Sequence, residues 1–329
     1  MATNPLVSIA LCTYNGAKYL QPLLDSVLVQ TYQNIEIIVV DDCSTDTTHD
    51  ILAVYAKGHP NILIYKNEKN LGFVKNFERA LNYCNGEIIA LCDQDDIWRA
   101  NKIELQVKAL GDNVLIYHDS EFVSEDGITL NKKMSDLFSF YSGNQPEVFL
   151  LSNCVSGHSI LVKREIIKYA LPLNEGLYHD WWIAYVATNH GSIDYIPEGL
   201  VKYRQHEKSD TDLLWIKSDD KYRKMSSTEL IARDIKWLTQ CVNYAGNKNP
   251  GFVREFYELY INRIDSYTAF KLMRFMLKNI SILFYIHKLS KAEKLRRVVR
   301  MAWGFKTKNL WYKYIKGNEK KIIKLDTLE

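Results

Sequence analysis

The sequence predicts an α/β protein built on a doubly wound, mostly parallel, Rossmann-like β-sheet, followed by a helical C-terminal region. Short apolar runs alternate with segments of helical periodicity over about the first 125 residues, an order typical of βαβ units. Polar residues follow several of these runs, and parallel sheets bind ligands at the carboxyl ends of their strands. Beyond residue 216 the pattern is helical and rich in Tyr, Lys and Arg.

The first two predicted strands, residues 7–11 and 35–40, are apolar and rich in β-branched side chains. Between them, residues 17–30 carry Leu and Val at helical spacing, which predicts a helix with one apolar face. The second strand ends in Asp41 and Asp42. These carboxylates therefore lie at the edge of the sheet where a ligand is expected.

The alternation continues along the chain and then weakens after residue 125, where a loop or short helices are predicted up to residue 147. A helix begins in the segment YHDWW, and the chain shows a boundary near residues 212–220. Further strands are predicted at 62–65, 87–92, 114–117, 121–123, 155–162, 195–196 and 200–203, and further helices near 72–81 and 98–110.

Three carboxylates, Asp93, Asp95 and Asp96, directly follow the apolar strand that ends at Cys92. Neighbouring carboxylates repel one another and resist burial. They are tolerated where they are fully solvated, where they cap a helix, or where a cation neutralises them. Asp96 is a candidate cap for a helix that begins near Trp98, and the cluster as a whole is a candidate cation site.

Composition is that of a globular protein, with 47% apolar and 25% charged residues. The six cysteines form no CxxC pair and are expected to be reduced thiols of a cytosolic protein. We expect no secretory signal and no membrane-spanning helix. Charge is uneven: residues 271–324 hold sixteen Lys and Arg against two acidic residues, a net charge of +14, whereas residues 1–270 carry −9.

The motifs VSIALCTYNGAKYL, IIVVDDCSTDTT, KNLGFVKNFERAL, GEIIALCDQDDIW, YHDWW and YRQH together resemble family 2 glycosyltransferases of the GT-A fold. The forms DQDDIW and HDWW are most similar to the bacterial rhamnosyltransferase-like branch. The resemblance covers about residues 5–210. It implies a GT-A domain over 1–215, with a nucleotide-sugar-binding half at 1–112 and an acceptor half at 113–215, and a basic helical region at 216–329.

For function, the resemblance implies inverting, metal-dependent sugar transfer in bacterial surface-polysaccharide synthesis. The donor would be a UDP- or dTDP-sugar, with dTDP-L-rhamnose among the candidates, and the acceptor a saccharide or a lipid-linked saccharide. A divalent cation would neutralise charge on the leaving diphosphate, and oxygen ligands suit Mg²⁺ or Mn²⁺.

By the same resemblance, Asp95 is the main metal ligand, and Asp93 contacts the ribose or the metal and its water. His206 in YRQH would approach the metal or the diphosphate, although a lone histidine is more often structural. Arg204 could pair with phosphate or with a local carboxylate.

The nucleotide contacts implied by the family lie at the first two strand ends. Asp42 would accept the imide N–H of uracil or thymine, with Cys12, Thr13 and Tyr14 lining the pocket. Asn76 is either a phosphate or base contact or part of a solvated helix face.

Asp180 in YHDWW matches the family's general base, which accepts the proton of the attacking hydroxyl. Trp181 and Trp182 could stack on the acceptor sugar, and for them a place in the core is as good an interpretation. His158 is expected to contact the acceptor.

The basic C-terminal region interleaves cations with aromatic residues, which suits an anionic membrane surface. The alternative is a helical cap on the acidic body, and no motif supports a nucleic-acid partner. We therefore expect a cytoplasmic protein, peripheral on the inner face of the cell membrane. Two other functions remain open: a nucleotidyltransferase, and a sugar-nucleotide-binding, membrane-docking protein without catalysis.

Overall fold

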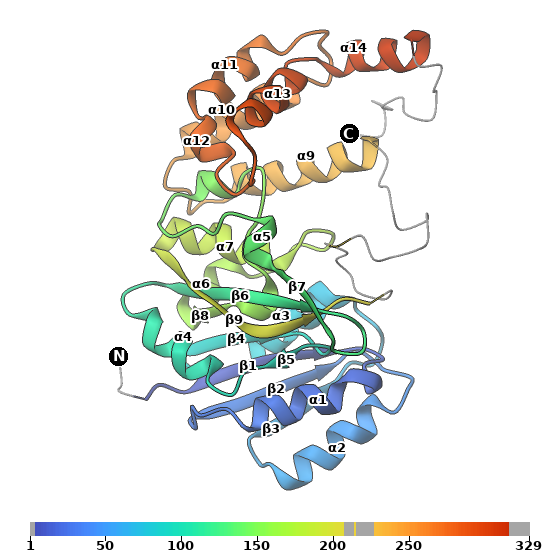
Figure 1. Ribbon diagram of the computed structural model, residues 1–329, viewed down its shortest axis with the longest axis vertical. Coiled ribbons are helices and arrows are strands. Elements are labelled where there is room, and N and C mark those ends of the chain that lie inside the picture. Colours follow the sequence, from blue (N-terminus) through green and yellow to red (C-terminus); the bar gives the residue numbers. More distant parts are fainter. Residues whose placement is uncertain (1–3, 207–213, 215–226, 316–329) are drawn as a thin grey trace. The chain divides into compact units, whose positions relative to one another are not determined.

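The computed structural model describes residues 4–206, 214 and 227–315, and divides into two compact units (Figure 1). The first unit comprises residues 1–144 and 153–211, and the second comprises residues 145–152 and 212–329. From the sequence, residues 145–152 are predicted to belong to the first unit. In the structure this segment belongs to the second unit, where its 3₁₀ turn η1 (Pro146–Phe149) packs against α12 (Ile280–Leu283).

The first unit is built on a nine-stranded sheet of order β3-β2-β1-β4-β8-β6-β9-β5, with β7 paired to β6. Strands β3, β2, β1 and β4 are parallel, as are β6 and β9, while β8, β5 and β7 run antiparallel to their neighbours. The predicted α/β fold with a mostly parallel sheet is thus confirmed. The strands are β1 (Val7–Thr13), β2 (Ile35–Asp41), β3 (Ile62–Lys66), β4 (Ile88–Cys92), β5 (Ile97–Trp98), β6 (Leu115–Val123), β7 (Thr129–Lys133), β8 (Leu161–Lys163) and β9 (Ile193–Arg204).

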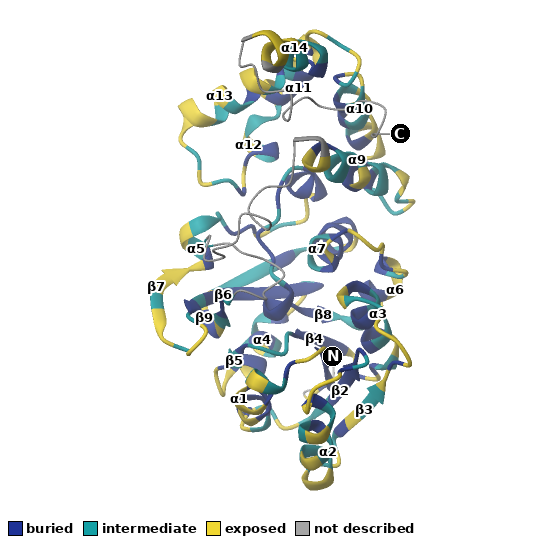
Figure 2. Ribbon diagram, turned by 90° about the vertical axis from the view of Figure 1, so that its right-hand side faces the viewer, coloured by how far each residue is buried: buried dark blue, intermediate teal, exposed yellow. Residues whose placement is uncertain are grey.

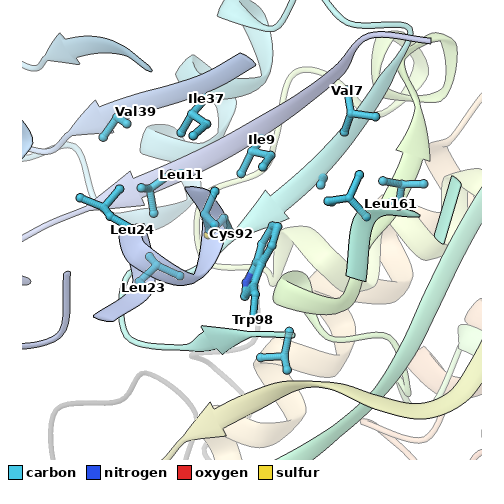
Figure 3. Close-up of a cluster of buried hydrophobic side chains, with 14 of the residues drawn as sticks. Val7, Ile9, Leu11, Leu23, Leu24, Ile37, Val39, Cys92, Trp98 and Leu161 are labelled. Carbon is cyan, nitrogen blue, oxygen red and sulfur yellow. The ribbon is translucent and has the colours of Figure 1, made fainter. Parts of the chain in front are cut away.

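Helices cover both faces of this sheet. Odd-numbered residues of β1, such as Ile9 and Leu11, point into a core shared with α1 and α4 (Figure 3). On the opposite face α3 packs against β1 and β2. The central strands are buried along their length (Figure 2), as parallel strands covered on both faces should be. The helices are α1 (Ala17–Leu28), α2 (Thr48–Gly58), α3 (Phe73–Tyr83), α4 (Lys102–Leu110), α5 (Met134–Leu137), α6 (Arg164–Ala170) and α7 (His179–His190).

Several predicted elements differ in the structure. The strands predicted at 114–117 and 121–123 are one strand, β6, and the strand predicted at 155–162 is reduced to β8, which follows the 3₁₀ turn η2 (Gly157–Ser159). The strands predicted at 195–196 and 200–203 are parts of one strand, β9, whose pairing with β6 is irregular on both sides of Asp119 because residues 197, 198 and 200 have no partner in the register. Trp98 does not begin a helix but lies in the two-residue strand β5, and α4 begins only at Lys102. The region predicted as a loop or short helices contains the short helix α5, which agrees with the prediction, and the strand β7, which does not.

The second unit is helical, as predicted for the C-terminal region. Two of its helices begin with side-chain caps: Asn249 accepts from the backbone N–H of Phe252, and Ser290 and Glu293 form a capping box. None of its described helices, nor any described in the first unit, is long and apolar enough to cross a membrane. The helices are α9 (Ser227–Asn243), α10 (Pro250–Ile261), α11 (Phe270–Lys278), α12 (Ile280–Leu283), α13 (Lys291–Met301) and α14 (Phe305–Leu310), followed by the single π-turn η3 (Trp311–Ile315).

Candidate active site

The carboxyl ends of β1, β2 and β4 meet at one edge of the sheet, as predicted. The hydroxyl of Thr13 donates to Asp41 (2.9 Å), which joins the end of β1 to β2. Gln94, the middle residue of the acidic turn after β4, accepts from the backbone N–H of Tyr14 (2.8 Å) and donates to its carbonyl (3.1 Å). These bonds hold the three strand ends together as one polar surface.

Gly16 leaves the space that the Gln94 amide occupies. A Cβ atom on Gly16 would lie 2.1 Å from Oε1 of Gln94, so Gly16→Ala should expel this amide and break both of its bonds to Tyr14. We expect a loss of about 1–3 kcal/mol in the free energy of unfolding, measured by chemical denaturation. Gly251→Ala is the matched control, because a Cβ there meets nothing within 4 Å. Equal stabilities of the two variants would contradict this account.

The expected nucleotide pocket is lined by Asp42, whose carboxylate is firmly fixed. Its oxygens accept from the side-chain amide of Asn67 (2.6 Å) and from the backbone N–H groups of Leu71 (2.8 Å) and Gly72 (2.9 Å). A carboxylate has about four acceptor positions, so one more donor, such as an imide N–H, can still be accepted.

Asn76 is an internal support and neither a solvated residue nor a free ligand contact. It is 2% exposed. Its amide donates to the carbonyl of Val40 (2.8 Å) and accepts from Asn67 (2.9 Å). Both interpretations offered by the sequence are therefore wrong for its side chain, because it is buried and bonded to Val40 and Asn67 inside the protein.

The three residues predicted at the end of β1 differ in exposure. Cys12 and Thr13 are buried, and burial raises the pKa of the Cys12 thiol well above its usual value. Their side chains are therefore inward, which leaves the backbone for any ligand contact. Tyr14 is 46% exposed and presents its ring at the edge where the strands end.

The acidic turn after β4 is clamped by the end of β9. The carboxylate of Asp95 lies 2.8 Å from Nε2 of His206, so the structure brings together two predicted metal ligands that are far apart in the chain. Asp96 is fully buried and accepts from the backbone N–H of Arg204 (3.0 Å). Asp96 therefore does not cap a helix, because the chain continues into β5 and α4 begins six residues later.

The guanidinium of Arg204 stabilises the acidic turn and is not directed toward a ligand. The side chain is 5% exposed, and its guanidinium donates to the carbonyls of Asp95 (2.8 Å) and Glu125. The guanidinium lies 5.0 Å from the ring of Tyr19, which also stacks on His206 at 4.9 Å. The predicted phosphate or carboxylate partner is thus replaced by backbone carbonyls.

A second group of ligand atoms lies behind the turn, where oxygens of Asp93 and Asp96 and Nδ1 of His158 lie within 4.8 Å of one another. Nδ1 is 3.5 Å from Oδ2 of Asp96 and 3.9 Å from Oδ2 of Asp93, and Nε2 is 2.7 Å from the hydroxyl of Ser120. Burial, together with nearby Lys102, lowers the pKa of His158 to about 3, so the imidazole is neutral at pH 7.

This second group fits a divalent cation. Among the described residues, Oδ2 of Asp96 is buried without a hydrogen-bond donor, which is costly for a carboxylate. Burial, followed by the charges of Asp95 and Asp93, raises the pKa of Asp96 well above its usual value. A cation would relieve both conditions. His158 is 1% exposed, so the predicted acceptor contact is wrong: its ring faces the acidic turn.

Asp180 lies in the first turn of α7 and is partly exposed. Burial of its carboxylate raises its pKa to about 6, although the backbone N–H groups of Trp181 and Gly157 oppose the shift. Its neighbour His179 is buried and stacks on Phe77 at 4.2 Å. Burial lowers the pKa of His179 to about 4, so this imidazole is neutral at pH 7.

The two tryptophans have different surroundings. Trp182 is 6% exposed and its indole N–H donates to the carbonyl of Ala170 (2.8 Å). It belongs to the core, and the sugar-stacking interpretation is wrong for it. Trp181 is partly exposed beside Asp180 and stays a predicted acceptor contact.

Sequence reasoning missed Gln94, Asn67 and Ser120, which orient the predicted site residues. Only Gln94 has a signal in the sequence, because it sits between Asp93 and Asp95. Asn67 and Ser120 act through partners 25 and 38 positions away, and no local pattern reports such contacts.

Comparison with known proteins agrees with this geometry. Residues 8–170 match the family model described as Glycosyl transferase family 2. An uncharacterized glycosyltransferase of Methanocaldococcus jannaschii is 31% identical over 210 residues, covering 61% of this chain and 71% of the relative. TuaG of Bacillus subtilis, named for teichuronic acid biosynthesis, is 35% identical over 131 residues, covering 39% of this chain and 52% of the relative.

Among solved structures, S. aureus TarS 1-349 in complex with UDP has a TM-score of 0.58 at 17% sequence identity, covering 95% of this chain and 89% of that 1-349 chain. A Pyrobaculum calidifontis mannosyltransferase in complex with GDP-Man and Mn²⁺ has a TM-score of 0.54 at 16% identity, covering 95% and 89%. The fold and site thus define a glycosyltransferase of the GT-A type. The chain belongs to glycosyltransferase family 2.

Proposed function

We propose that this protein is an inverting, Mg²⁺- or Mn²⁺-dependent enzyme of bacterial surface-polysaccharide synthesis. It would transfer a sugar from a nucleotide-diphosphate donor to a saccharide or lipid-linked saccharide. One observation carries the proposal: the 3₁₀ turn η2 (Gly157–Ser159) joins the acidic site to the candidate base. His158 faces Asp96, and its neighbour Gly157 donates its N–H to Asp180.

The donor is proposed to be a UDP- or dTDP-sugar, with dTDP-L-rhamnose among the candidates. Asp42 supports an imide-bearing base, because its fixed carboxylate accepts N–H donors. A UDP complex of the structural neighbour TarS supports the uridine option. Exposed Tyr14 offers a ring face on which a base could stack.

For the cation, we propose Asp95 and Asp93 as ligands that share it with the donor diphosphate, with His206 orienting Asp95 through their 2.8 Å contact. When bound, the cation would neutralise charge on the departing diphosphate. Asp96 and His158 lie near Asp93 and could supply a further oxygen and a nitrogen ligand to the cation.

Asp180 is proposed to accept the proton of the attacking acceptor hydroxyl. A pKa of about 6 leaves the carboxylate mostly ionised at neutral pH and still basic enough to take a proton. Trp181 would form part of the acceptor wall. With the donor in the proposed nucleotide half and the base in the proposed acceptor half, the hydroxyl would attack from the face opposite the leaving group and invert the anomeric centre.

The second unit is proposed to dock the cytoplasmic enzyme on the inner face of the cell membrane. Exposed aromatic residues and many Lys and Arg suit an anionic lipid interface. Its exposed large aromatic residues include Tyr267, Phe270, Tyr285, Trp303 and Trp311.

The proposal is tested by screening nucleotide sugars for release of the free nucleotide diphosphate. We expect release from one UDP- or dTDP-sugar that requires Mg²⁺ or Mn²⁺ and increases when the acceptor is added. NMR of the product would show an inverted anomeric configuration. Release of pyrophosphate from a nucleoside triphosphate and a sugar phosphate would instead identify a nucleotidyltransferase. Binding without any turnover would identify a non-catalytic protein.

A further inference from the structure

The second unit contains an apolar hollow that the sugar-transfer site does not use. Its volume is about 260 Å³, and it lies among α11, α12 and α13. Ligand pockets for whole drug-sized molecules begin at roughly 300 Å³, so this hollow fits a segment of hydrocarbon chain better than a nucleotide sugar. Its walls are Leu277, Ile280, Ser281, Leu289, Lys291, Lys294 and Leu295.

Two cations, Lys291 and Lys294, stand at this apolar hollow. Within the described part of the chain, neither of them forms an ion pair with a carboxylate. The one acid of α13, Glu293, is held in the capping box by Ser290. Burial, followed by the charges of Arg297 and Lys294, lowers the pKa of His287. The ammonium group of Lys294 therefore acts electrostatically on this ring.

The outer surface of α13 is unusual for a soluble helix. Leu295 and Val299, one turn apart, are 40% and 51% exposed, while basic residues fill much of the rest of the helix. Leu277 of α11, which also lines the hollow, is 39% exposed. Apolar side chains at the mouth of the hollow therefore continue its lining out to the surface.

We propose that this hollow binds one hydrocarbon chain of a phosphate-bearing lipid, with the phosphate held by Lys291 and Lys294. Apolar walls beside two ammonium groups match a ligand that is part alkyl chain and part anion. This lipid would be the anchor of a lipid-linked acceptor, and that assignment rests on the proposed function. The binding itself does not.

Isothermal titration of the full chain with dodecyl phosphate, below its critical micelle concentration, tests the site. We expect saturable one-to-one binding, and inorganic phosphate should bind at least tenfold more weakly because it fills no apolar wall. Lys291→Gln with Lys294→Gln should weaken dodecyl phosphate binding by about 10- to 30-fold. Ser281→Phe fills the hollow and keeps both charges, and it should abolish dodecyl phosphate binding.

The matched control is Lys271→Gln with Arg274→Gln, which removes two exposed charges from α11 without touching the hollow. It should keep dodecyl phosphate binding within about twofold, and its melting temperature checks the fold of all variants. Equal weakening by the two double variants would reduce the effect to general electrostatics and overturn the proposal. Binding of Ser281→Phe as tight as wild type, or equal affinities for dodecyl and inorganic phosphate, would overturn it too.

Vesicles and nucleotide release separate this inference from the proposed function. Co-sedimentation with phosphatidylcholine vesicles should rise when phosphatidylglycerol is added, and rise less for the Lys291 and Lys294 double variant than for the control. If dodecyl phosphate binds as expected while no nucleotide sugar is turned over, the lipid site stands and the proposed transfer falls. If nucleotide sugar is turned over and no alkyl phosphate binds, the transfer stands and the lipid site falls.

Discussion

Substitution of Asp95 by asparagine is expected to abolish nearly all sugar transfer, with a fall in kcat/KM of at least about 10²- to 10³-fold, the cost of removing one preorganised charge contact. The change keeps shape and can still accept from His206, which lies 2.8 Å away, so the fold should be preserved. It removes negative charge where the cation and the donor diphosphate are proposed to meet. Affinity for Mn²⁺ in the presence of nucleotide diphosphate, measured by titration calorimetry, should fall in parallel.

Asp126→Asn provides the control, because Asp126 is an exposed carboxylate in the loop between β6 and β7. Its activity should stay within about twofold of wild type, since isolated surface charges contribute little. Exhaustive chelation of the wild type should reduce activity as much as Asp95→Asn does, and added Mn²⁺ or Mg²⁺ should restore the wild-type activity. Full activity in a chelated, metal-free preparation would exclude a metal-dependent reaction.

His158→Gln distinguishes the two possible cation positions. If the cation sits at Asp95 and Asp93, losing His158 should weaken Mn²⁺ binding far less than Asp95→Asn does. If it sits deeper, against Asp93, Asp96 and His158, the two variants should lose comparable affinity. Unfolding measurements are needed here, because His158 is buried and bonds Ser120.

Much of the fold can be predicted because its signals are local. Strands β1, β2 and β4 are continuous apolar runs, and the helices between them show one apolar face. The sequence pattern splits β9 into two strands, since Pro197 and Gly199 interrupt it while pairing with β6 carries the strand through them. Strand β5 is not predicted because two residues are too few to show a hydrophobic periodicity. Only their pairing with β9 makes them a strand.

The sequence predicts which residue types form the candidate site, but it predicts the orientations of their side chains less well. Asp95 and His206 are grouped correctly, because chemistry and order along the chain both indicate the same edge of the sheet. The errors at Asn76 and His158 share one cause: each side chain is turned inward by packing against a segment distant in sequence. For Trp182 the structure decides between two open interpretations in favour of the core, through a contact with Ala170 on the preceding helix. Burial of this kind decides between a ligand contact and a structural role, and a single sequence does not contain it.

Asp180→Asn is expected to lower kcat by about 10²- to 10⁴-fold, the usual range for loss of a general base. Asparagine keeps the size of the side chain at the start of α7 but cannot accept the proton of the acceptor hydroxyl. The affinity for donor should change little, because the nucleotide pocket is formed at the ends of β1 and β2. Single-turnover kinetics with saturating donor would separate the chemical step from binding.

The pH dependence of the wild type provides an independent measure of the same group. Burial raises the pKa of Asp180 to about 6, and only the ionised carboxylate can act as a base. The rate should therefore be flat above about pH 7 and fall as the pH drops through about 6, and this limb should vanish in Asp180→Asn. Glu175→Gln, which removes an exposed carboxylate just before α7, should keep both the rate and the pH profile of the wild type.

Wild-type turnover in Asp180→Asn would place the base elsewhere. Loss of the rate and of the acidic limb of the pH profile in Glu175→Gln would point to Glu175. His179, neutral and buried beside Asp180, would then be tested as His179→Asn.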